Sequence, residues 1–125
     1  MAATGADPMA VVEVWDRALR EGDWEAARAV LADGATYVAL NDPYATCTNA
    51  EQIVGLMRSW KGKLPDVEVD QWETIGSRVL AQLRQPAWED ATWFQVLTVN
   101  GGLIRRLEDH PTREAALAAI DGVEP

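Results

Sequence analysis

Two apolar segments near the end of the chain are separated by an Asn-Gly dipeptide, and this feature most constrains the fold. The segments span residues 91–99 and 103–109, with Asn100-Gly101 between them. An Asn-Gly dipeptide between apolar runs is a strong hairpin signal, because both central residues of the matching turn need positive φ. Pro111 then ends the second strand, and a short helix is predicted over residues 112–120. We expect any chemistry on a small molecule to lie on the concave side of this hairpin.

The segments before the hairpin predict helices first and strands afterwards. Helices are expected where Asp, Asn or Pro precede an apolar stripe of helical period, and strands where the period changes to two. From Val67 this alternation places Val67, Val69 and Gln71 on one face and Trp72 on the other. The predicted helices span 7–20, 24–32 (ended by Asp33-Gly34) and a segment opened by Asn49 and Gln52, and the predicted strands span 36–41, 67–74 and 79–84, with a turn at Gly76-Ser77.

Helices followed by closely spaced strands predict an α+β domain, with helices on one face of a largely antiparallel sheet. The chain has 125 residues, enough for one domain with a real core. We expect a flexible tail over residues 1–6 and a single domain over residues 7–121.

Charge and composition exclude several classes of function. The formal net charge is -9, and such an acidic chain disfavours binding to nucleic acid or to an anionic membrane. One histidine and one cysteine supply no cluster of metal ligands and no intramolecular disulfide. We therefore expect no metal and no cofactor. The sequence shows neither a secretion signal nor a long apolar run, so a cytoplasmic location is the default expectation.

Aromatic residues are the main candidates for a ligand pocket. The chain has six tryptophans, and a monomer rarely exposes so much aromatic area. Trp15, Trp60 and Trp93, with Tyr37, are predicted to form the pocket wall, or else to be ordinary core. Gln95 lies inside the apolar run of residues 93–97, so a buried Gln95 must bond to a ligand or to a neighbouring side chain. The three other tryptophans, Trp24, Trp72 and Trp88, are interpreted as structural or interface residues.

Two segments carry a resemblance to a known family. GDWEAARAVLADGATY near the second helix and GGLIRRLEDHPTREAALAAI at the end resemble the nuclear-transport-factor-2-like superfamily, and more narrowly its SnoaL-like branch. The resemblance covers about residues 11–120. It implies a cone-shaped α+β barrel, in which a strongly curved sheet wraps over three helices and a short helix ends the chain. It also implies a hydrophobic pocket at the mouth of the cone and a homodimer. Because this scaffold hosts many activities, the resemblance predicts fold better than function.

Three enzyme types on this scaffold place their catalytic groups differently. The ketosteroid isomerase positions hold Trp15, roughly Ala39, and Gln95 in this sequence. Against limonene-epoxide-hydrolase-like enzymes, Tyr37 matches a strand tyrosine and Asp109 matches the final aspartate.

Asn41 lies two positions beyond the asparagine that accompanies this tyrosine, on the same face. The Arg-x-Asp pair of a middle strand is absent, since Arg84 is followed by Gln85 and Pro86. In polyketide-cyclase-like members, an acidic residue at the mouth of the cone acts as acid and base, and Asp109 is again the candidate.

Strand parity predicts the surroundings of Asp109. It places Leu103, Arg105 and Leu107 on the same face, where Arg105 could hold the carboxylate ionised, and His110 on the opposite face as a surface or dimer contact. The alternative is that Asp109 caps the following helix or that Glu108 and Asp109 form a solvated face.

Two functions follow. The first is a SnoaL-like protein that binds a small hydrophobic molecule and acts as a cofactor-independent isomerase, cyclase or epoxide hydrolase. The second is a non-catalytic ligand-binding or dimeric assembly module. An enzyme predicts a carboxylate deep in the cavity with a raised pKa, whereas a module predicts Asp109 in water. The candidate catalytic residues are Asp109, Tyr37 and Asn41, and the candidate ligand-binding residues are Trp15, Trp60, Trp93, Gln95 and Arg105.

Overall fold

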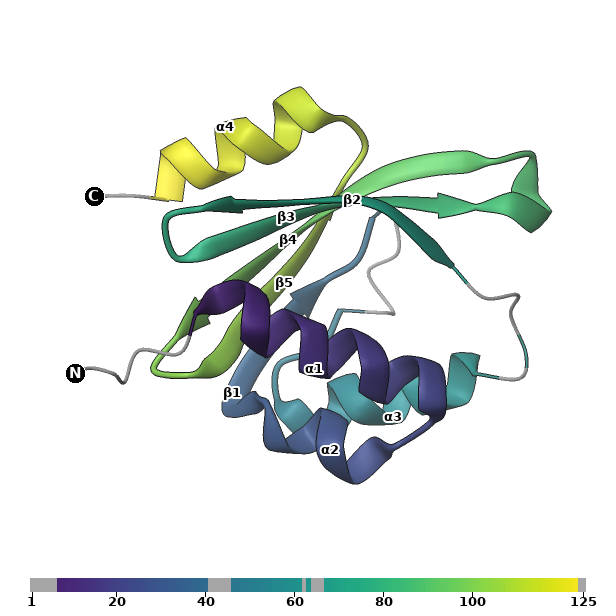
Figure 1. The fold of residues 1–125 in the computed structure, drawn as a ribbon, viewed down its shortest axis with the longest axis vertical. Helices are drawn as coiled ribbons and strands as arrows, with labels where there is room; N and C mark the ends of the chain where they lie inside the picture. The colour runs from purple at the N-terminus through teal and green to yellow at the C-terminus, as the bar shows by residue number, and fades with distance from the viewer. Residues whose placement is uncertain (1–6, 41–45, 62, 64–66, 124–125) are drawn as a thin grey trace.

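A computed structural model of the chain describes residues 7–40, 46–61, 63 and 67–123 (Figure 1). Helices and strands follow in the order that the sequence predicts. They are α1 (Pro8–Glu21), α2 (Trp24–Ala29), β1 (Leu31–Val38), α3 (Ala50–Trp60), β2 (Glu68–Ile75), β3 (Arg78–Gln85), the 3₁₀ turn η2 (Pro86–Trp88), β4 (Ala91–Asn100), β5 (Leu103–His110) and α4 (Arg113–Val123).

Local capping explains where the first three helices begin. The Asp7 carboxylate accepts from the amide of Met9, and Pro8 occupies the first turn of α1. The side chains of Asp23 and Asn49 cap α2 and α3 in the same way. These predicted helix starts are confirmed, because each cap satisfies an amide that has no partner inside its helix.

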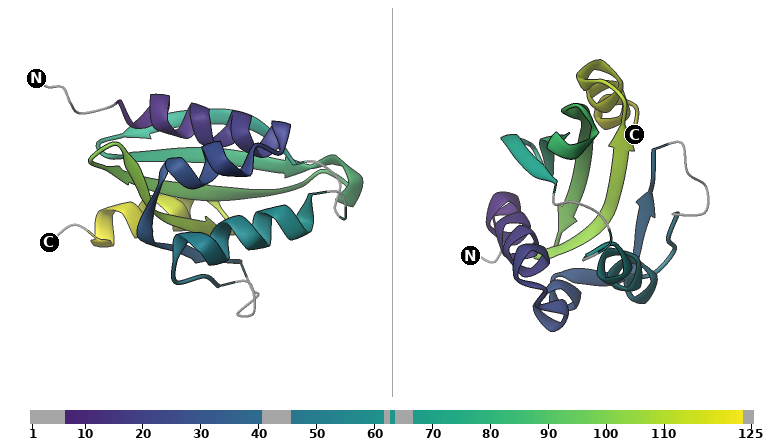
Figure 2. Two further views of the ribbon diagram at one scale, coloured as in Figure 1. Left: turned by 90° about the horizontal axis from the view of Figure 1, so that it is seen from below. Right: turned by 90° about the vertical axis from the view of Figure 1, so that its right-hand side faces the viewer.

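The strands form one five-stranded sheet in the order β1-β5-β4-β3-β2. β1 and β5 are parallel, and the other neighbouring strands are antiparallel. The sheet is strongly curved; α1, α2 and α3 lie on its concave side, and α4 lies on the opposite face (Figure 2). The predicted α+β architecture, a curved and mostly antiparallel sheet wrapped over three helices, is confirmed.

The two faces of the sheet carry separate hydrophobic clusters. The larger cluster joins the three N-terminal helices to the concave face and includes Val12, Ile53, Leu97 and Leu107. The smaller cluster joins α4 to the convex face and consists of Leu80, Val96, Ala116 and Ile120, with partly buried neighbours around it. Both faces of the central strands are therefore covered, which makes an inward-facing polar group on these strands informative.

The boundary between α2 and β1 differs from the prediction. α2 ends at Ala29, and β1 already begins at Leu31, so Asp33-Gly34 lies within the strand and does not end the helix. The amide of Ile104 donates to the carbonyl of Val30 at 2.7 Å, which starts the pairing with β5 early. The register then shifts between Leu31 and Thr36, and this irregularity accommodates the exposed Asp33-Gly34 pair.

The turn of the β4–β5 hairpin lies one residue later than the dipeptide suggests. Asn100 pairs with Leu103, so Gly101 and Gly102 are the two central residues, with φ of 65° and 77°. Glycine adopts positive φ without a Cβ penalty. A turn with two central glycines is therefore preferred to a turn with Asn100 at the first central position. The turn predicted at Gly76-Ser77 is found where expected, since Ile75 pairs with Arg78.

Candidate functional site

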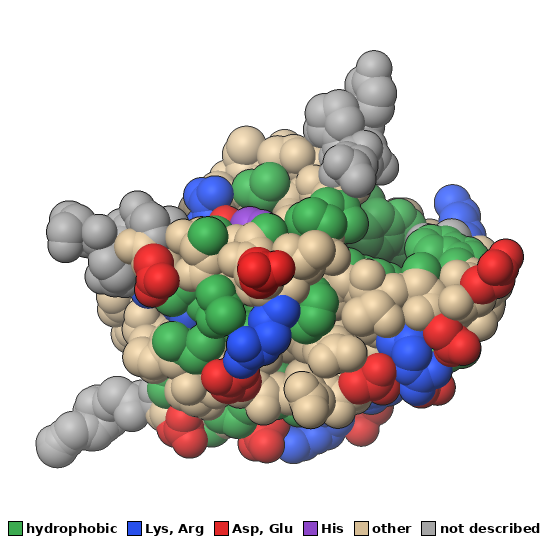
Figure 3. All heavy atoms as spheres, turned by 90° about the horizontal axis from the view of Figure 1, so that it is seen from above, with side chains coloured by type: hydrophobic (Ala, Val, Ile, Leu, Met, Phe, Trp, Pro, Cys, Tyr) green, Lys and Arg blue, Asp and Glu red, His purple; other side chains and the backbone are tan. Residues whose placement is uncertain are grey.

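A cavity of about 540 Å³ lies between the concave face of the sheet and the helices. Its volume is within the range of sites that bind small molecules. Hydrophobic side chains gather around a hollow on one side of the face seen in Figure 3. The wall is mostly apolar, and its polar side chains come from α1, the residue after α3, and strands β1, β3, β4 and β5. The aliphatic and methionine side chains of the wall include Leu19, Leu40, Met57, Val67, Val69, Leu83, Leu97 and Leu107.

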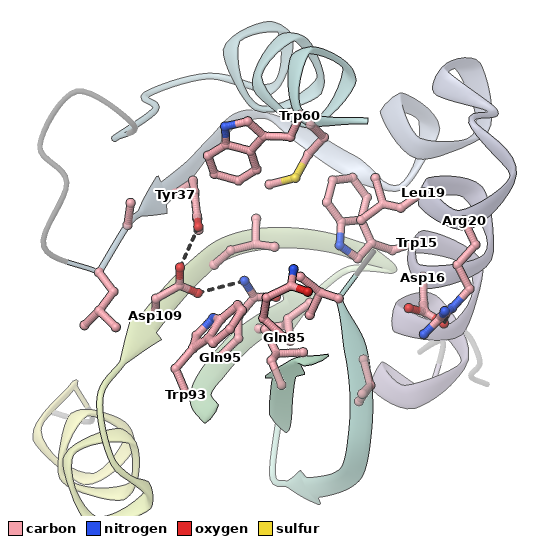
Figure 4. Close-up of a pocket in the computed structure, with 18 of the residues that line it drawn as sticks. Trp15, Asp16, Leu19, Arg20, Tyr37, Trp60, Gln85, Trp93, Gln95 and Asp109 are labelled. Atoms are coloured by element: carbon pink, nitrogen blue, oxygen red, sulfur yellow. Dashed lines mark hydrogen bonds and ion pairs between the residues drawn. The ribbon is translucent and has the colours of Figure 1, made fainter. Parts of the chain in front are cut away.

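All six tryptophans of the chain line this cavity. The placement of Trp15, Trp60 and Trp93 in the wall follows the prediction (Figure 4). The interpretation of Trp24, Trp72 and Trp88 as structural or interface residues did not anticipate that they also line the cavity. Trp88 is 51% exposed, so it belongs to the rim of the cavity rather than to its interior.

A β-bulge explains why Trp72 lies on a different face from the one predicted. Val69 pairs with Leu83, but Gln71 pairs with Gln82, so β2 holds one extra residue at this point. The extra residue reverses the alternation, and Val69 and Trp72 line the same cavity. The prediction that these two residues lie on opposite faces is wrong for this reason.

Asp109 lies on β5 with its carboxylate directed into the cavity (Figure 4). The Tyr37 hydroxyl donates to Asp109 Oδ2 at 2.5 Å, and the Gln95 amide donates to Oδ1 at 2.9 Å. Gln95 and Asp109 are direct partners across β4 and β5, which fixes their spacing. A tyrosine, a glutamine and an aspartate that are far apart in sequence thus form one hydrogen-bonded group.

Burial controls the titration of this group. Desolvation raises the pKa of Asp109 above its ordinary value of 3.8, because the apolar surroundings penalise the charged form. Hydrogen bonds from Tyr37, Gln95 and the backbone amide of Leu40 lower the pKa and offset part of this effect. The net direction is upward, so protonated Asp109 persists to higher pH than a solvated aspartic acid does.

Tyr37 is fixed by contacts on several sides. Its backbone exchanges two hydrogen bonds with Cys47, of 3.0 and 2.9 Å, and its Cα pairs with Leu107 on β5. Its ring packs edge-on against Trp60, with centroids 6.5 Å apart and an interplanar angle of 79°. Only 3% of Tyr37 is exposed, so its hydroxyl is held in place for the bond to Asp109.

The predicted position of Arg105 is wrong. Thr98 pairs with Arg106 and Val99 pairs with Ile104, so Arg105 is an extra residue in β5. Its exposed side chain folds over the hairpin turn and donates to the carbonyl of Asn100 at 3.2 Å. Arg105 is not among the residues that line the cavity and does not pair with Asp109.

Arg84 also lies away from the cavity. Its guanidinium bonds to Glu68, Asp70 and Asp90 at the surface, and these contacts raise its pKa. The inward residues at this end of β3 are Leu83 and Gln85, and neither carries a charge. The middle-strand carboxylate of epoxide hydrolases therefore has no equivalent at these positions.

Gln85 is a lining residue that the sequence did not single out. It is 1% exposed, its side chain accepts from the amide of Ala87, and its amide lies at the cavity in Figure 4. The signal was present in the sequence, since Gln85 ends an apolar strand immediately before Pro86. The predicted catalytic residue Asn41 lies outside the described residues.

Glu108 and His110 lie on the opposite face of β5 from Asp109. Glu108 is 7% exposed and bonds to Arg106 at 2.9 Å, while His110 Nε2 lies 3.4 Å from the other Glu108 oxygen. The placement of His110 on the face opposite Asp109 is as predicted. The alternative of a solvated Glu108-Asp109 face is wrong, because hydrogen-bonded partners cover both carboxylates.

The described part of the chain contains no cluster of three or more histidine, cysteine or acidic side chains that could hold a metal ion. Within the same residues, no helix is long and apolar enough to cross a membrane. The Cys47 thiol is buried, and burial raises its pKa, which makes it a poor nucleophile.

Solved structures with the same architecture include proteins of known and unknown activity. A proposed polyketide cyclase from Sinorhizobium meliloti is 17% identical, with a TM-score of 0.70 over 84% of this chain and 100% of that chain. An NTF2-like protein of unknown function from Cytophaga hutchinsonii is 15% identical, with a TM-score of 0.70 over 93% and 99%. An LEH-like epoxide hydrolase from M. tuberculosis is 18% identical, with a TM-score of 0.65 over 92% and 96%.

No family model matches the sequence, and no curated protein matches it significantly. At these identities the structural likeness speaks for the fold and not for the activity. The predicted resemblance is thus confirmed at the level of architecture: the chain has the NTF2-like fold that these three structures share.

Proposed function

We propose that this protein binds a small hydrophobic molecule in the tryptophan-lined cavity and transfers a proton on it through Asp109, without a cofactor. The observation that carries the proposal is the Asp109 carboxylate at the apolar cavity, bonded by Tyr37 and Gln95. A raised pKa brings this carboxylate closer to the pH range in which it can act as a base and, once protonated, as an acid.

The surroundings favour a reaction that one carboxylate can complete. In an isomerisation or cyclisation, Asp109 takes a proton from one atom of the ligand and returns it to another. Tyr37 donates to Asp109 while the carboxylate is charged, and its hydroxyl can turn to a polarised ligand oxygen when Asp109 is protonated. The indoles of Trp15, Trp60 and Trp93 exclude water from this exchange.

Epoxide opening is the less favoured reaction. Such an opening needs one group to activate water and another to protonate the leaving oxygen. Asp16 and Asp109 are the acidic residues of the described cavity wall, and the Arg20 side chain bonds to Asp16 at 2.9 Å. With Leu83 and Gln85 inward on β3, the second carboxylate has no position near Asp109 on that strand.

A non-catalytic ligand-binding or dimeric assembly module is the second candidate. The missing second carboxylate favours it, since both better-known types of enzyme on this scaffold use a further acidic residue. In this version the cavity binds the ligand by its apolar wall, and Asp109 serves only as a hydrogen-bond acceptor. The homodimer expected from the resemblance is compatible with both candidates.

The first experiment measures binding by the intrinsic tryptophan fluorescence. Because all six indoles line the cavity, a ligand there should change the emission spectrum. A panel of apolar alcohols, ketones and lactones provides the probes, and bound compounds are then incubated with the protein in D₂O. Incorporation of deuterium at carbon, detected by mass spectrometry, is the expected sign of proton transfer.

Asp109→Asn separates the two candidates. The variant should still bind the probes but lose deuterium incorporation, because the amide neither takes nor returns a proton. Asp33→Asn is the matched control, since Asp33 is exposed and pairs with Arg28 away from the cavity. If wild-type protein binds probes and exchanges no proton with any of them, the binding module is the correct description.

A further inference from the structure

The cavity wall is unusually rich in electron-dense rings. Its six indoles are joined by the phenol of Tyr37, whose ring contacts Trp60. The face of an indole attracts a cation more strongly than the face of any other side chain does. A purely aliphatic ligand would be held as well by leucine and valine, so this composition points to a ligand with positive charge.

Among the described residues, Asp109 bonds to no cationic side chain on its own side of the sheet. Its hydrogen-bond partners are the Tyr37 hydroxyl, the Gln95 amide and the backbone amide of Leu40, and all three are neutral. His110 lies on the opposite face beside Glu108 and is not among the residues that line the cavity. A buried carboxylate is normally paired with a cation. The cavity side of Asp109 therefore suits a ligand that supplies a positive charge.

The cations of the cavity wall are bound at the other side of the cavity. Arg20 bonds to Asp16 one turn earlier on α1, and the Lys61 ammonium donates to the carbonyl of Arg20 at 2.9 Å. Figure 4 shows Asp16 and Arg20 across the cavity from Asp109. The C-terminal end of α1 carries partial negative charge, which also holds Lys61 there.

We propose that the ligand is a hydrophobic molecule with a protonated amine, whose ammonium group donates to Asp109 while its apolar body packs against the surrounding indoles. The inference rests on the binding part of the proposed function and is independent of proton transfer. The two oxygens of Asp109 together accept three hydrogen bonds, and a carboxylate has about four acceptor sites, so capacity remains for an ammonium N–H. Tyr37 and Gln95 then orient the carboxylate toward the ligand.

Three probes with the same apolar body test the inference: adamantyl amine, adamantanol and adamantane carboxylate. They absorb little where tryptophan emits, so fluorescence titration and calorimetry both apply. At pH 7 the amine should bind about tenfold more tightly than the alcohol, because a charge-assisted hydrogen bond replaces a neutral one. The carboxylate should bind most weakly, since it would meet Asp109 with like charge.

Asp109→Asn should remove the preference for the amine and leave the alcohol within about threefold of its wild-type affinity, since the amide keeps the size of the carboxylate. The Gln95 amide can turn so that its oxygen accepts from the new amide. Asp33→Asn is again the control and should keep the wild-type preference. Trp93→Leu should weaken the amine more than the alcohol, since it removes one aromatic face.

The outcomes are distinct. An amine that binds no better than the alcohol to wild-type protein overturns the inference and leaves the proposed hydrophobic site standing. A preference that survives in Asp109→Asn also overturns it, because another group must then bind the cation. If none of the three probes binds, the hydrophobic site itself is refuted together with the inference.

Discussion

Glu108 and Asp109 are neighbours on β5, yet the two faces of the sheet give their carboxylates opposite surroundings. Glu108 faces the side that carries α4, bonds to the Arg106 guanidinium and lies beside the His110 imidazole. Asp109 faces the cavity and is bonded by the neutral side chains of Tyr37 and Gln95. Glu108 is buried and Asp109 is half-buried, and their partners are the clearer difference between them.

In the proposed function, this difference separates a structural carboxylate, Glu108, from a functional one, Asp109. A buried charge that is paired with cations stabilises or specifies the fold. A buried charge that meets only neutral donors has a raised pKa and remains available to a ligand. The adjacent pair on one strand therefore provides an internal control, and the following variants test it.

The largest expected effect is on turnover. Asp109→Asn should lower the rate of proton transfer at least about 100-fold, because it removes the group that takes and returns the proton. Glu108→Gln should leave the rate within about threefold, since its side chain lies on the other face. Deuterium incorporation into a bound probe measures both rates, and equal losses in the two variants would refute the distinction between the faces.

Ligand binding should depend on the cavity-facing residue of β4 and not on its neighbour that faces α4. Trp93 lines the cavity, whereas Phe94 packs with the cluster beneath α4. Trp93→Leu should weaken binding of adamantanol roughly tenfold, because about 50 Å² of apolar contact is lost. Phe94→Leu should change the affinity less than about twofold, although it removes a ring of similar size from the fold. A Phe94 variant with weaker binding than the Trp93 variant would place the ligand on the convex face.

The free energy of unfolding should fall more in Glu108→Gln than in Asp109→Asn, the reverse of the order expected for turnover. Glu108→Gln removes the carboxylate that bonds to Arg106 and lies beside His110 and should lower the free energy of unfolding by roughly 1–2 kcal/mol. The loss is moderate because the Arg106 side chain is 45% exposed and regains water. Asp109→Asn should cost less at pH 7, since it also removes the desolvation of a buried charge. Urea unfolding of both variants at pH 7 provides the comparison, and a larger loss for Asp109→Asn would contradict it.

A smaller effect is expected in the pH dependence of stability. The raised pKa means that folded protein binds the Asp109 proton more tightly than unfolded protein does. The stabilisation that comes from binding this proton is fully present below pH 3.8, the ordinary pKa. It is lost as the pH rises through the raised pKa of folded protein. Relative to wild type, Asp109→Asn should therefore gain stability as the pH rises through this window.

Thermal unfolding of wild type, Asp109→Asn and Asp33→Asn between pH 3.8 and 7 measures this difference. The Tm difference between wild type and Asp109→Asn should move by a few degrees, in favour of the variant. The Asp33→Asn protein is the control, because Asp33 is exposed and lies away from the cavity. A trend in the opposite direction would mean that Asp109 is stabilised in its charged form.

Much of this arrangement follows from local sequence. The caps of Asp7, Asp23 and Asn49 start the helices, and short-range hydrogen bonds act at each one. The approximate position of the β4–β5 hairpin was also predictable from the sequence, because its turn depends on a few adjacent residues. Tyr37, Gln95 and Asp109 were each identified as candidates, and strand parity gave the side on which Asp109 lies.

The errors arise where the sheet departs from regular alternation. One extra residue in β2 brings Trp72 to the same side as Val69, and one extra residue in β5 removes Arg105 from the side of Asp109. Neither bulge has a sequence signal comparable to a cap or a turn, because it is set by pairing with another strand. The bond from Gln95 to Asp109 likewise depends on register, which the sequence does not state.

The smallest expected effect tests the bulge in β5 directly. Arg105→Gln should leave the pKa of Asp109 unchanged, because the guanidinium lies over the hairpin turn and donates to the carbonyl of Asn100. Gln95→Leu is the contrasting variant. It removes a hydrogen bond that lowers the pKa of Asp109, so the pKa should rise further. An NMR titration of the Asp109 carboxyl group measures the pKa in both proteins. If Arg105→Gln raises that pKa as much as Gln95→Leu does, the arginine acts on the cavity after all, and the absence of a cation beside Asp109 can no longer distinguish this carboxylate from Glu108.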